Sequence, residues 1–167
     1  IIRRVHAFVR RSEPKLEPAD LNAIIREAVG LVEPDAIRRG VDIDVDLDEN
    51  LPGVLADPVM IEQVAVNLIR NGMDAMADSP RDARHVQLTT HEADGMLIFS
   101  VADRGKGIPP DVAEKLFAPF FTTKEEGMGM GLNICRSIAE LHRGRLTFEA
   151  HPGGGTIFNF SLPVHTQ

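Results

Sequence analysis

Two asparagines, one helical turn apart, are the first residues in this sequence with an evident chemical use. Asn67 and Asn71 lie in the string NLIRNGMDAM, within a segment from Asp57 to about Ala77 whose apolar residues recur at helical spacing. A spacing of four places both side chains on one face, at the edge of the apolar stripe. Amide oxygens are hard, neutral ligands that suit Mg²⁺ held mainly by phosphates and water. Taken alone, the pair is explained more simply as two polar residues on an exposed helix flank.

A carboxylate beside two glycines supplies a second signal. Asp103, Gly105 and Gly107 directly follow an apolar segment predicted to be a strand. The strand would bring the Asp103 carboxylate to the end of a sheet, where it could accept a hydrogen bond from an exocyclic amine such as that of adenine. The glycines would let the backbone approach a flat ring closely. An ordinary turn is the competing explanation.

Glycines also precede the predicted helix from about 130 to 141. Gly127, Gly129 and Gly131 would leave backbone N–H groups free to bind phosphate near a helix N-terminus, and Lys124 could add a positive charge. No strand precedes them, so they do not form a dinucleotide-binding fingerprint, and Gly107 occupies the Ser/Thr position that a Walker A loop would need after Lys106. A fourth signal, the glycine run 153–155 before Thr156, is by itself only a hairpin turn.

Helices and strands alternate along the chain in a way that can bring these signals together. Apolar residues at helical or alternating spacing predict each element. In chain order they are a helix tail over 1–12, a proline-marked linker, a helix from the cap Asp20, a strand over 41–47, a helix over 57–77, a hairpin of 85–91 and 96–102, a short helix near 111–117, the helix 130–141, and strands over 145–150 and 156–162.

Composition narrows the classes of function. The 167 residues suit a single domain, and a formal charge of −7 excludes a surface for nucleic-acid phosphates, which needs clustered Lys and Arg. No apolar run reaches the roughly 20 residues that span a bilayer, and no signal peptide is present. We therefore expect a soluble, cytoplasmic fragment without membrane contact, whether or not its parent is anchored in a membrane.

Three further residue types predict structure more than chemistry. The single Cys135 is expected to be a buried structural thiol, and the six histidines show no metal-ligand spacing. Aspartates 42, 44, 46 and 48 alternate along a predicted strand, which sends them to a solvent face and does not converge them as a calcium loop would.

In their order, these strings resemble the N, G1, F and G2 boxes, and the glycine turn resembles the G3 box, of the ATP-binding domain of sensor histidine kinases. The phrases LFAPFFTTK and GMGMGLNICRSI resemble the nitrogen-regulation, oxygen-sensing and dicarboxylate-sensing kinases in particular. The resemblance implies a two-layer α/β sandwich of the Bergerat type, with a mixed, mostly antiparallel sheet and helices on one face. It also implies that 1–13 closes a dimerisation helix pair, with a linker to about 19, and that 20–167 is the ATP-binding domain.

The resemblance further implies a role for each site residue. Asn71, assisted by Asn67, would hold Mg²⁺, and Lys124 would join them in catalysis. The residues implied to bind ATP are Asn71, Asp103, Gly105, Gly107, Phe120, Thr122, Thr123, Lys124, Gly127, Gly129, Gly131, Leu132 and Thr156.

The implied reaction is transfer of the γ-phosphoryl group of Mg·ATP to a histidine on the dimerisation domain of the same parent, for relay to an aspartate of a response regulator. His6 is followed by Ala7, where the family places an acidic residue after its acceptor histidine, so the nucleophile is expected elsewhere. One rival is an ATPase like gyrase B or MutL, which carries a glutamate four residues before the magnesium asparagine, where this chain has Asn67. A second rival is a nucleotide-binding domain without catalysis.

Overall fold

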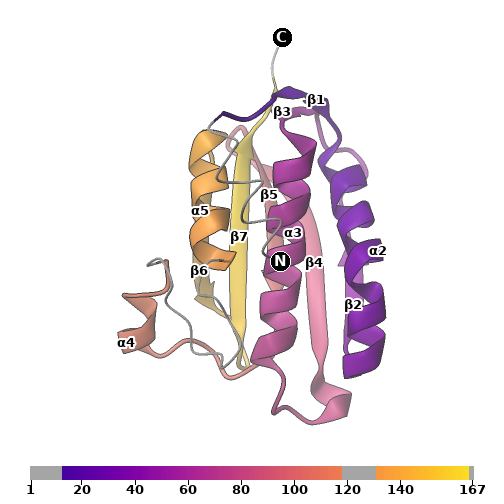
Figure 1. The fold of residues 1–167 in the computed structure, drawn as a ribbon, viewed down its shortest axis with the longest axis vertical. Coiled ribbons are helices and arrows are strands. Elements are labelled where there is room, and N and C mark those ends of the chain that lie inside the picture. The colour runs from indigo at the N-terminus through magenta and orange to yellow at the C-terminus, as the bar shows by residue number, and fades with distance from the viewer. Residues whose placement is uncertain (1–12, 118–130, 166–167) are drawn as a thin grey trace.

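Three long helices pack against one face of a five-stranded sheet in the computed structural model, which describes residues 13–117 and 131–165 (Figure 1). The sheet order is β2-β4-β5-β7-β6, and the helices are α2, α3 and α5. In chain order the elements are β1 (Glu17–Ala19), α2 (Leu21–Arg39), β2 (Asp42–Asp46), β3 (Val54–Ala56), α3 (Pro58–Ala75), a 3₁₀ turn (Arg81–Ala83), β4 (His85–Ala93), β5 (Met96–Ala102), α4 (Pro110–Ala113), α5 (Gly131–Leu141), β6 (Arg145–Ala150) and β7 (Thr156–Pro163).

The sheet is mixed and mostly antiparallel, as predicted. Only β2 and β4 run parallel, and the β4–β5, β5–β7 and β6–β7 pairs are antiparallel. Along β5 and β7, buried and half-buried residues alternate, because successive side chains of a strand point to opposite faces. The buried set, which includes Phe99, Phe158 and Phe160, faces the helices, so the core lies in a single layer between helices and sheet.

The central helix α3 forms where the sequence predicted it. Asp57 caps it by accepting from the N–H groups of Val59 and Met60, and Pro58 occupies the first turn, where its missing N–H has no helical partner to lose. Leu68 and Ile69 are fully buried in its apolar stripe. Because α3 contacts both α2 and α5 as well as the sheet, its residues are held from three sides.

The helix α2 is confirmed with both of its ends. Asp20 caps the first turn, and Gly40 ends the helix in the left-handed conformation, with φ of 68°. Arg84 then donates to the carbonyl oxygens of Arg39, Ala77 and Ser79, which follow or end α2 and α3. One guanidinium thereby satisfies acceptors that helix ends leave open.

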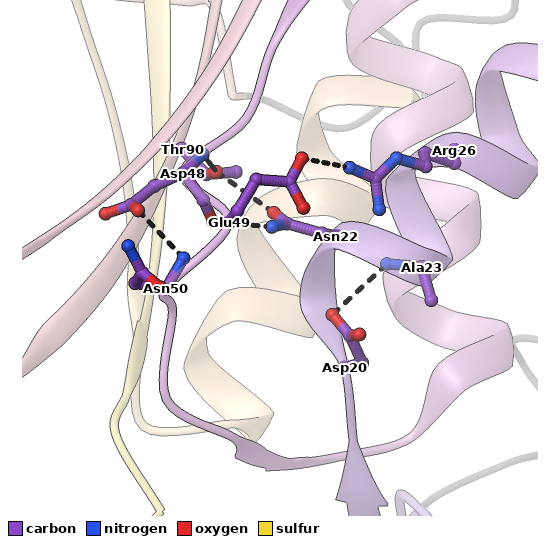
Figure 2. A network of polar contacts seen from close by, with 8 residues as sticks. All are labelled: Asp20, Asn22, Ala23, Arg26, Asp48, Glu49, Asn50 and Thr90. Atoms are coloured by element: carbon purple, nitrogen blue, oxygen red, sulfur yellow. Dashed lines mark hydrogen bonds and ion pairs between the residues drawn. The ribbon is translucent and has the colours of Figure 1, made fainter.

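A buried polar network fixes the start of α2 to the sheet (Figure 2). The Asn22 side chain donates to the Asp48 carbonyl oxygen at 2.7 Å and accepts from the Thr90 hydroxyl at 3.0 Å. The Thr90 oxygen accepts in turn from the Asp48 N–H at 2.9 Å. Because Asn22 and Thr90 are both nearly inaccessible, these bonds satisfy groups that would otherwise be costly to bury.

Several expectations require adjustment. The sequence predicted neither β1 nor β3, which pair antiparallel with each other, nor the 3₁₀ turn before β4. The helix expected near 111–117 is only the single turn α4, followed by turns to residue 117. Two prolines start α4, but no side chain caps it and no residue in it is buried, so little favours a longer helix.

Two expectations about ions and membranes can be compared with the described residues. Asp42, Asp44 and Asp46 are exposed along β2, and no cluster of three or more His, Cys, Asp or Glu in residues 13–117 and 131–165 could hold a metal ion. Among the same residues, no helix combines the length and the apolar character that a membrane span requires.

Two glycines provide a stability test of this architecture. Gly30 lies in the exposed interior of α2 with open space where a Cβ would lie, so Gly30→Ala should raise the free energy of unfolding by about 0.5–1 kcal/mol. A Cβ on Gly144 would instead overlap the carbonyl oxygen of Ser161, and Gly144→Ala should lower the free energy of unfolding by roughly 1–3 kcal/mol. Urea unfolding of both variants checks the pair, and equal effects would contradict the described packing of β6 on β7.

Candidate functional site

Asp103 lies at the centre of the site, at the point where β5 ends. Its side chain is almost fully buried, and its Oδ1 accepts from the N–H of Gly105 at 2.9 Å and from that of Thr156 at 3.2 Å. The Asp103 N–H also donates to the Thr156 carbonyl oxygen at 2.9 Å. The end of β5, the following loop and the start of β7 are therefore held together around one carboxylate.

The helix that carries Asn71 passes directly beside Asp103. A Cβ on Gly72 would lie 3.5 Å from the Asp103 Cβ, and one on Gly105 would overlap the backbone of Ala75, at the end of α3. The N–H of Arg104 also approaches the Met76 sulfur at 3.5 Å. Glycine is needed at 105 because the loop rests on the helix backbone, and the structure thereby brings the Asn71 turn and the Asp103 loop together.

The glycine turn before β7 packs against the same loop. Gly155 has a φ of 110°, and a Cβ there would overlap the Asp103 carbonyl oxygen. Thr156, next in the chain, is buried. The run 153–155, which alone indicates only a hairpin turn, thus contributes a close backbone contact that no larger residue could make.

The two carboxylate oxygens of Asp103 differ in their hydrogen bonds, and this difference determines what Asp103 can bind. Both hydrogen bonds among the described residues use Oδ1, and no buried side-chain nitrogen or oxygen in the described part of the chain lacks a partner. Oδ2 is therefore open to solvent or to a ligand, as an acceptor. Burial raises the pKa of Asp103 above the ordinary value of an aspartate, against the opposing effects of the Gly105 and Thr156 N–H groups and of His151.

Asn67 and Asn71 are both half-buried on α3, as a position beside an apolar stripe predicts. The Asn67 side chain lies beside the thiol of Cys135, a fully buried residue of α5 whose sulfur lies 4.0 Å from the Val64 carbonyl oxygen. Asn67 therefore faces α5, and the expectation that Cys135 is a buried thiol is confirmed.

The remaining predicted site residues fall into two groups. Gly107 is half-buried in the Asp103 loop with φ of 76°, Gly131 starts α5, and Leu132 packs against the core. The others lie outside the described residues: Phe120, Thr122, Thr123, Lys124, Gly127 and Gly129.

Sequence reasoning missed residues whose contribution is contact and not chemistry. Gly72 appears only as part of an apolar stripe, yet its lack of a side chain brings α3 against Asp103. His151, in the loop between β6 and β7, lies where a positive charge would lower the pKa of Asp103. A glycine directly after Asn71 was the one available signal, because a helical glycine often marks a close approach of another element.

Comparison with known proteins identifies the family to which this chain belongs. Residues 56–166 match the family model described as histidine kinase-, DNA gyrase B- and HSP90-like ATPase. The chain belongs to that family. Among curated relatives it is 46% identical to the C4-dicarboxylate transport sensor protein DctS of Rhodobacter capsulatus and 45% identical to the sensor protein FixL of Bradyrhizobium diazoefficiens, over 98% of this chain in each case. It spans only 25% of DctS and 32% of FixL.

Solved structures narrow the type of domain. The catalytic domain of the histidine kinase ThkA matches with a TM-score of 0.78 and 32% identity, over 89% of this chain and 95% of that one. Full-length ShkA, in complex with AMPPNP, matches with a TM-score of 0.80 and 31% identity, over 93% of this chain and 32% of that one. The chain is thus a catalytic ATPase domain of the sensor histidine kinase type, and its predicted fold class is confirmed.

For this ATPase domain, Asp103→Asn should separate ligand binding from stability. The amide oxygen can still accept from the Gly105 and Thr156 N–H groups, but an NH₂ replaces the open oxygen and cannot accept from an amine. We expect adenine-nucleotide affinity to fall about 10- to 100-fold, the size of a lost hydrogen bond to a charged group, when measured by calorimetric titration.

The same substitution should raise the melting temperature at neutral pH, because it removes a buried charge. A carboxyl group whose pKa is raised on folding contributes less stability as the pH increases. The loss begins near the ordinary pKa of an aspartate and is complete above the raised pKa of the folded state. The gap in melting temperature between Asp103→Asn and the wild-type chain should therefore widen as the pH rises above the ordinary pKa of an aspartate. A gap independent of pH would contradict this description of the site.

Cys135 should report on the contact between α3 and α5. Burial raises the pKa of its thiol to about 12, so at pH 8 roughly one molecule in ten thousand carries the reactive thiolate. We expect the folded chain to react with a thiol-specific disulfide reagent at least about 100-fold more slowly than the urea-unfolded chain. Fast labelling of the folded chain would show that the helices do not pack as described.

Proposed function

We propose that this chain binds Mg·ATP at the end of the molecule where α3, the Asp103 loop and the 153–155 turn meet. Asp103 would accept from the adenine amine, with Thr156 supporting the base. Asn71, assisted by Asn67, would hold Mg²⁺, and Lys124, Gly129 and Gly131 would bind the phosphates. The observation that carries the proposal is that Asp103 keeps one oxygen open while close glycine contacts seat it against the helix of Asn71.

The donor set fits the ligand that we propose. The buried Asp103 carboxylate can only accept hydrogen bonds, which suits an amine donor. The N–H groups of Gly105 and Thr156 already fix the orientation of this carboxylate. Amide oxygens suit a magnesium ion that retains its phosphate and water ligands. When bound, ATP would supply the phosphoryl group and Mg²⁺ would neutralise part of its charge. The residues of this chain would bind and orient the nucleotide and exclude water.

We further propose that the acceptor is a histidine on a dimerisation domain of the same polypeptide, that the phosphoryl group passes on to an aspartate of a response regulator, and that both steps occur in the cytoplasm. The curated sensor proteins that match are three to four times as long as the matched region, which leaves room for such a domain in a parent of similar length. Placement of two reactants in one complex is itself a large part of the catalysis of phosphoryl transfer.

Hydrolysis of ATP by a gyrase-like mechanism is not favoured. A general base would be needed four residues before Asn71, and Asn67 occupies that position, with its side chain beside the Cys135 thiol. An amide has no basic lone pair that could take a proton from water. We therefore propose that this domain transfers the phosphoryl group to a histidine and does not hydrolyse ATP.

The proposal predicts a metal-dependent loss of binding on Asn71→Ala. In calorimetric titrations with AMPPNP, Mg²⁺ should strengthen binding to the wild-type chain, and the variant should lose at least about 10-fold of that gain because one metal ligand is absent. Asn159→Ala, on the open face of the sheet, is the matched control and should bind as the wild-type chain does.

Phosphorylation gives the second readout of the same prediction. With γ-labelled ATP, the full-length parent should label its dimerisation domain, and the isolated chain should remain unlabelled. Binding that survives both Asn71→Ala and Asp103→Asn, or label on this chain alone, would refute the proposed site and reaction.

A further inference from the structure

The end of the molecule opposite the site holds a second buried carboxylate, Asp57, which is bonded to several parts of the described fold. Asp57 is 1% exposed, and its Oδ1 accepts from the N–H groups of Val59 and Met60 at 3.1 and 3.3 Å, which caps α3. Its Oδ2 accepts from the Lys15 N–H at 2.9 Å. Its own N–H donates to His142 Nε2 at 3.1 Å. One residue thus joins α3, the segment before β1, and the chain after α5.

The partners of His142 fix its protonation. Its Nδ1 lies 2.8 Å from the Ile138 carbonyl oxygen, which can only accept, so Nδ1 carries the proton. Nε2 is then the acceptor that the Asp57 N–H requires. The ring is 5% exposed and directly follows α5, so the neutral tautomer joins the C-terminal end of α5 to the N-cap of α3.

The two helices joined here are those that reach the candidate site at their other ends. The 18 residues of α3 form a rod of roughly 27 Å that carries Asn67 and Asn71 in its second half. In α5, which begins at Gly131, the Cys135 thiol lies beside Asn67. Asp57 therefore fixes the spacing of α3 and α5 far from any nucleotide, at one end of a pair whose other end lies beside the site.

The third partner connects this pair to the preceding chain. The Lys15 N–H is bonded two residues before β1, which pairs with β3 next to Asp57. The bond uses the backbone, and the Lys15 side chain is exposed. At Lys15, the preceding chain is therefore held to α3 by one oxygen of Asp57, next to the pairing of β1 with β3.

We propose that Asp57 is a positioning residue for phosphoryl transfer: by holding the Lys15 backbone, it sets the orientation of the whole catalytic domain relative to the chain that precedes Lys15, without contributing to nucleotide binding. This rests on the proposed function, because it assumes that the preceding chain leads to the acceptor histidine. A looser connection would lower the fraction of time in which phosphate and acceptor meet in a reactive geometry.

Asp57→Asn separates the roles of the two oxygens. The amide oxygen can still cap α3, as asparagine is a strong N-cap, and the backbone N–H still meets His142. The amide NH₂ cannot accept from Lys15, so the bond to Lys15 is lost. Lys15→Pro removes the same bond from the donor side, since proline has no N–H, and Lys15→Ala keeps that N–H and is the matched control.

The experiment uses the full-length protein and four readouts: the melting temperature, AMPPNP affinity, the initial rate of histidine phosphorylation, and hydrogen exchange of the Lys15 amide in all but the proline variant. Asp57→Asn and Lys15→Pro should leave nucleotide affinity within about 2-fold of wild type and lower the phosphorylation rate at least about 5-fold. The Lys15 amide should exchange faster in Asp57→Asn, and Lys15→Ala should match the wild-type protein in every readout.

Each other outcome counts against the inference. A wild-type phosphorylation rate in Asp57→Asn, with the Lys15 amide exchanging fast, would overturn it, and so would a loss of nucleotide affinity equal to the loss of rate, which would indicate a merely structural cap. Failure of the wild-type protein to bind nucleotide or to label its histidine would refute the proposed function itself, which is a separate and recognisable result.

Discussion

Burial of the Asp103 carboxylate is the constraint on which the rest of the site depends. A charge at the end of β5 can remain buried only because two backbone N–H groups, those of Gly105 and Thr156, point at one of its oxygens. That requirement sets the path of the loop after β5 and the start of β7, and it requires glycine at 105 and 155 because both backbones must come close. The other oxygen remains as an acceptor with a fixed direction. Burial disfavours the charged form, so the same group that can recognise an amine weakens the fold that holds it.

The helix α3 connects the Asp103 loop to the opposite end of the molecule. Its last turns contact the Asp103 loop through Gly72 and Ala75, and its first turn is capped by Asp57 at the opposite end. Between these ends it is packed between α2 and α5 over the sheet (Figure 1). A packed helix does not bend easily, so the packing along α3 should hold Asn71 in place when the bond between Asp57 and Lys15 is lost.

What the sequence could and could not predict follows from the range of the interactions. The helices beginning after Asp20 and Asp57 have caps and apolar spacing within one or two turns, and the Asp94-Gly95 hairpin has its turn residues adjacent, with both φ angles positive. These features are local and were predicted. The bonds from Asp57 to His142 and from Thr90 to Asn22 join residues 85 and 68 positions apart, and no periodicity reports such a pairing. β1 was missed for the same reason, since three residues that include a proline form a strand only because β3 lies beside them.

The site could be predicted as a set of residue types, Asn71, Asp103 and the glycines. The contact of Gly72 with Asp103 could not be predicted, because it depends on how α3 lies on the sheet.

The central claim is that Asn71, the Asp103 loop and the 153–155 turn form one nucleotide site. The most direct measurement is a titration of the isotope-labelled chain with Mg·AMPPNP, followed by the backbone amide resonances. The account predicts that the amides of Gly72, Gly105 and Thr156 shift together along a single binding curve, while the amides of His91 and Thr147, on the open face of the sheet, remain in place. Shifts confined to that open face, or separate binding curves for Gly72 and Gly105, would contradict it.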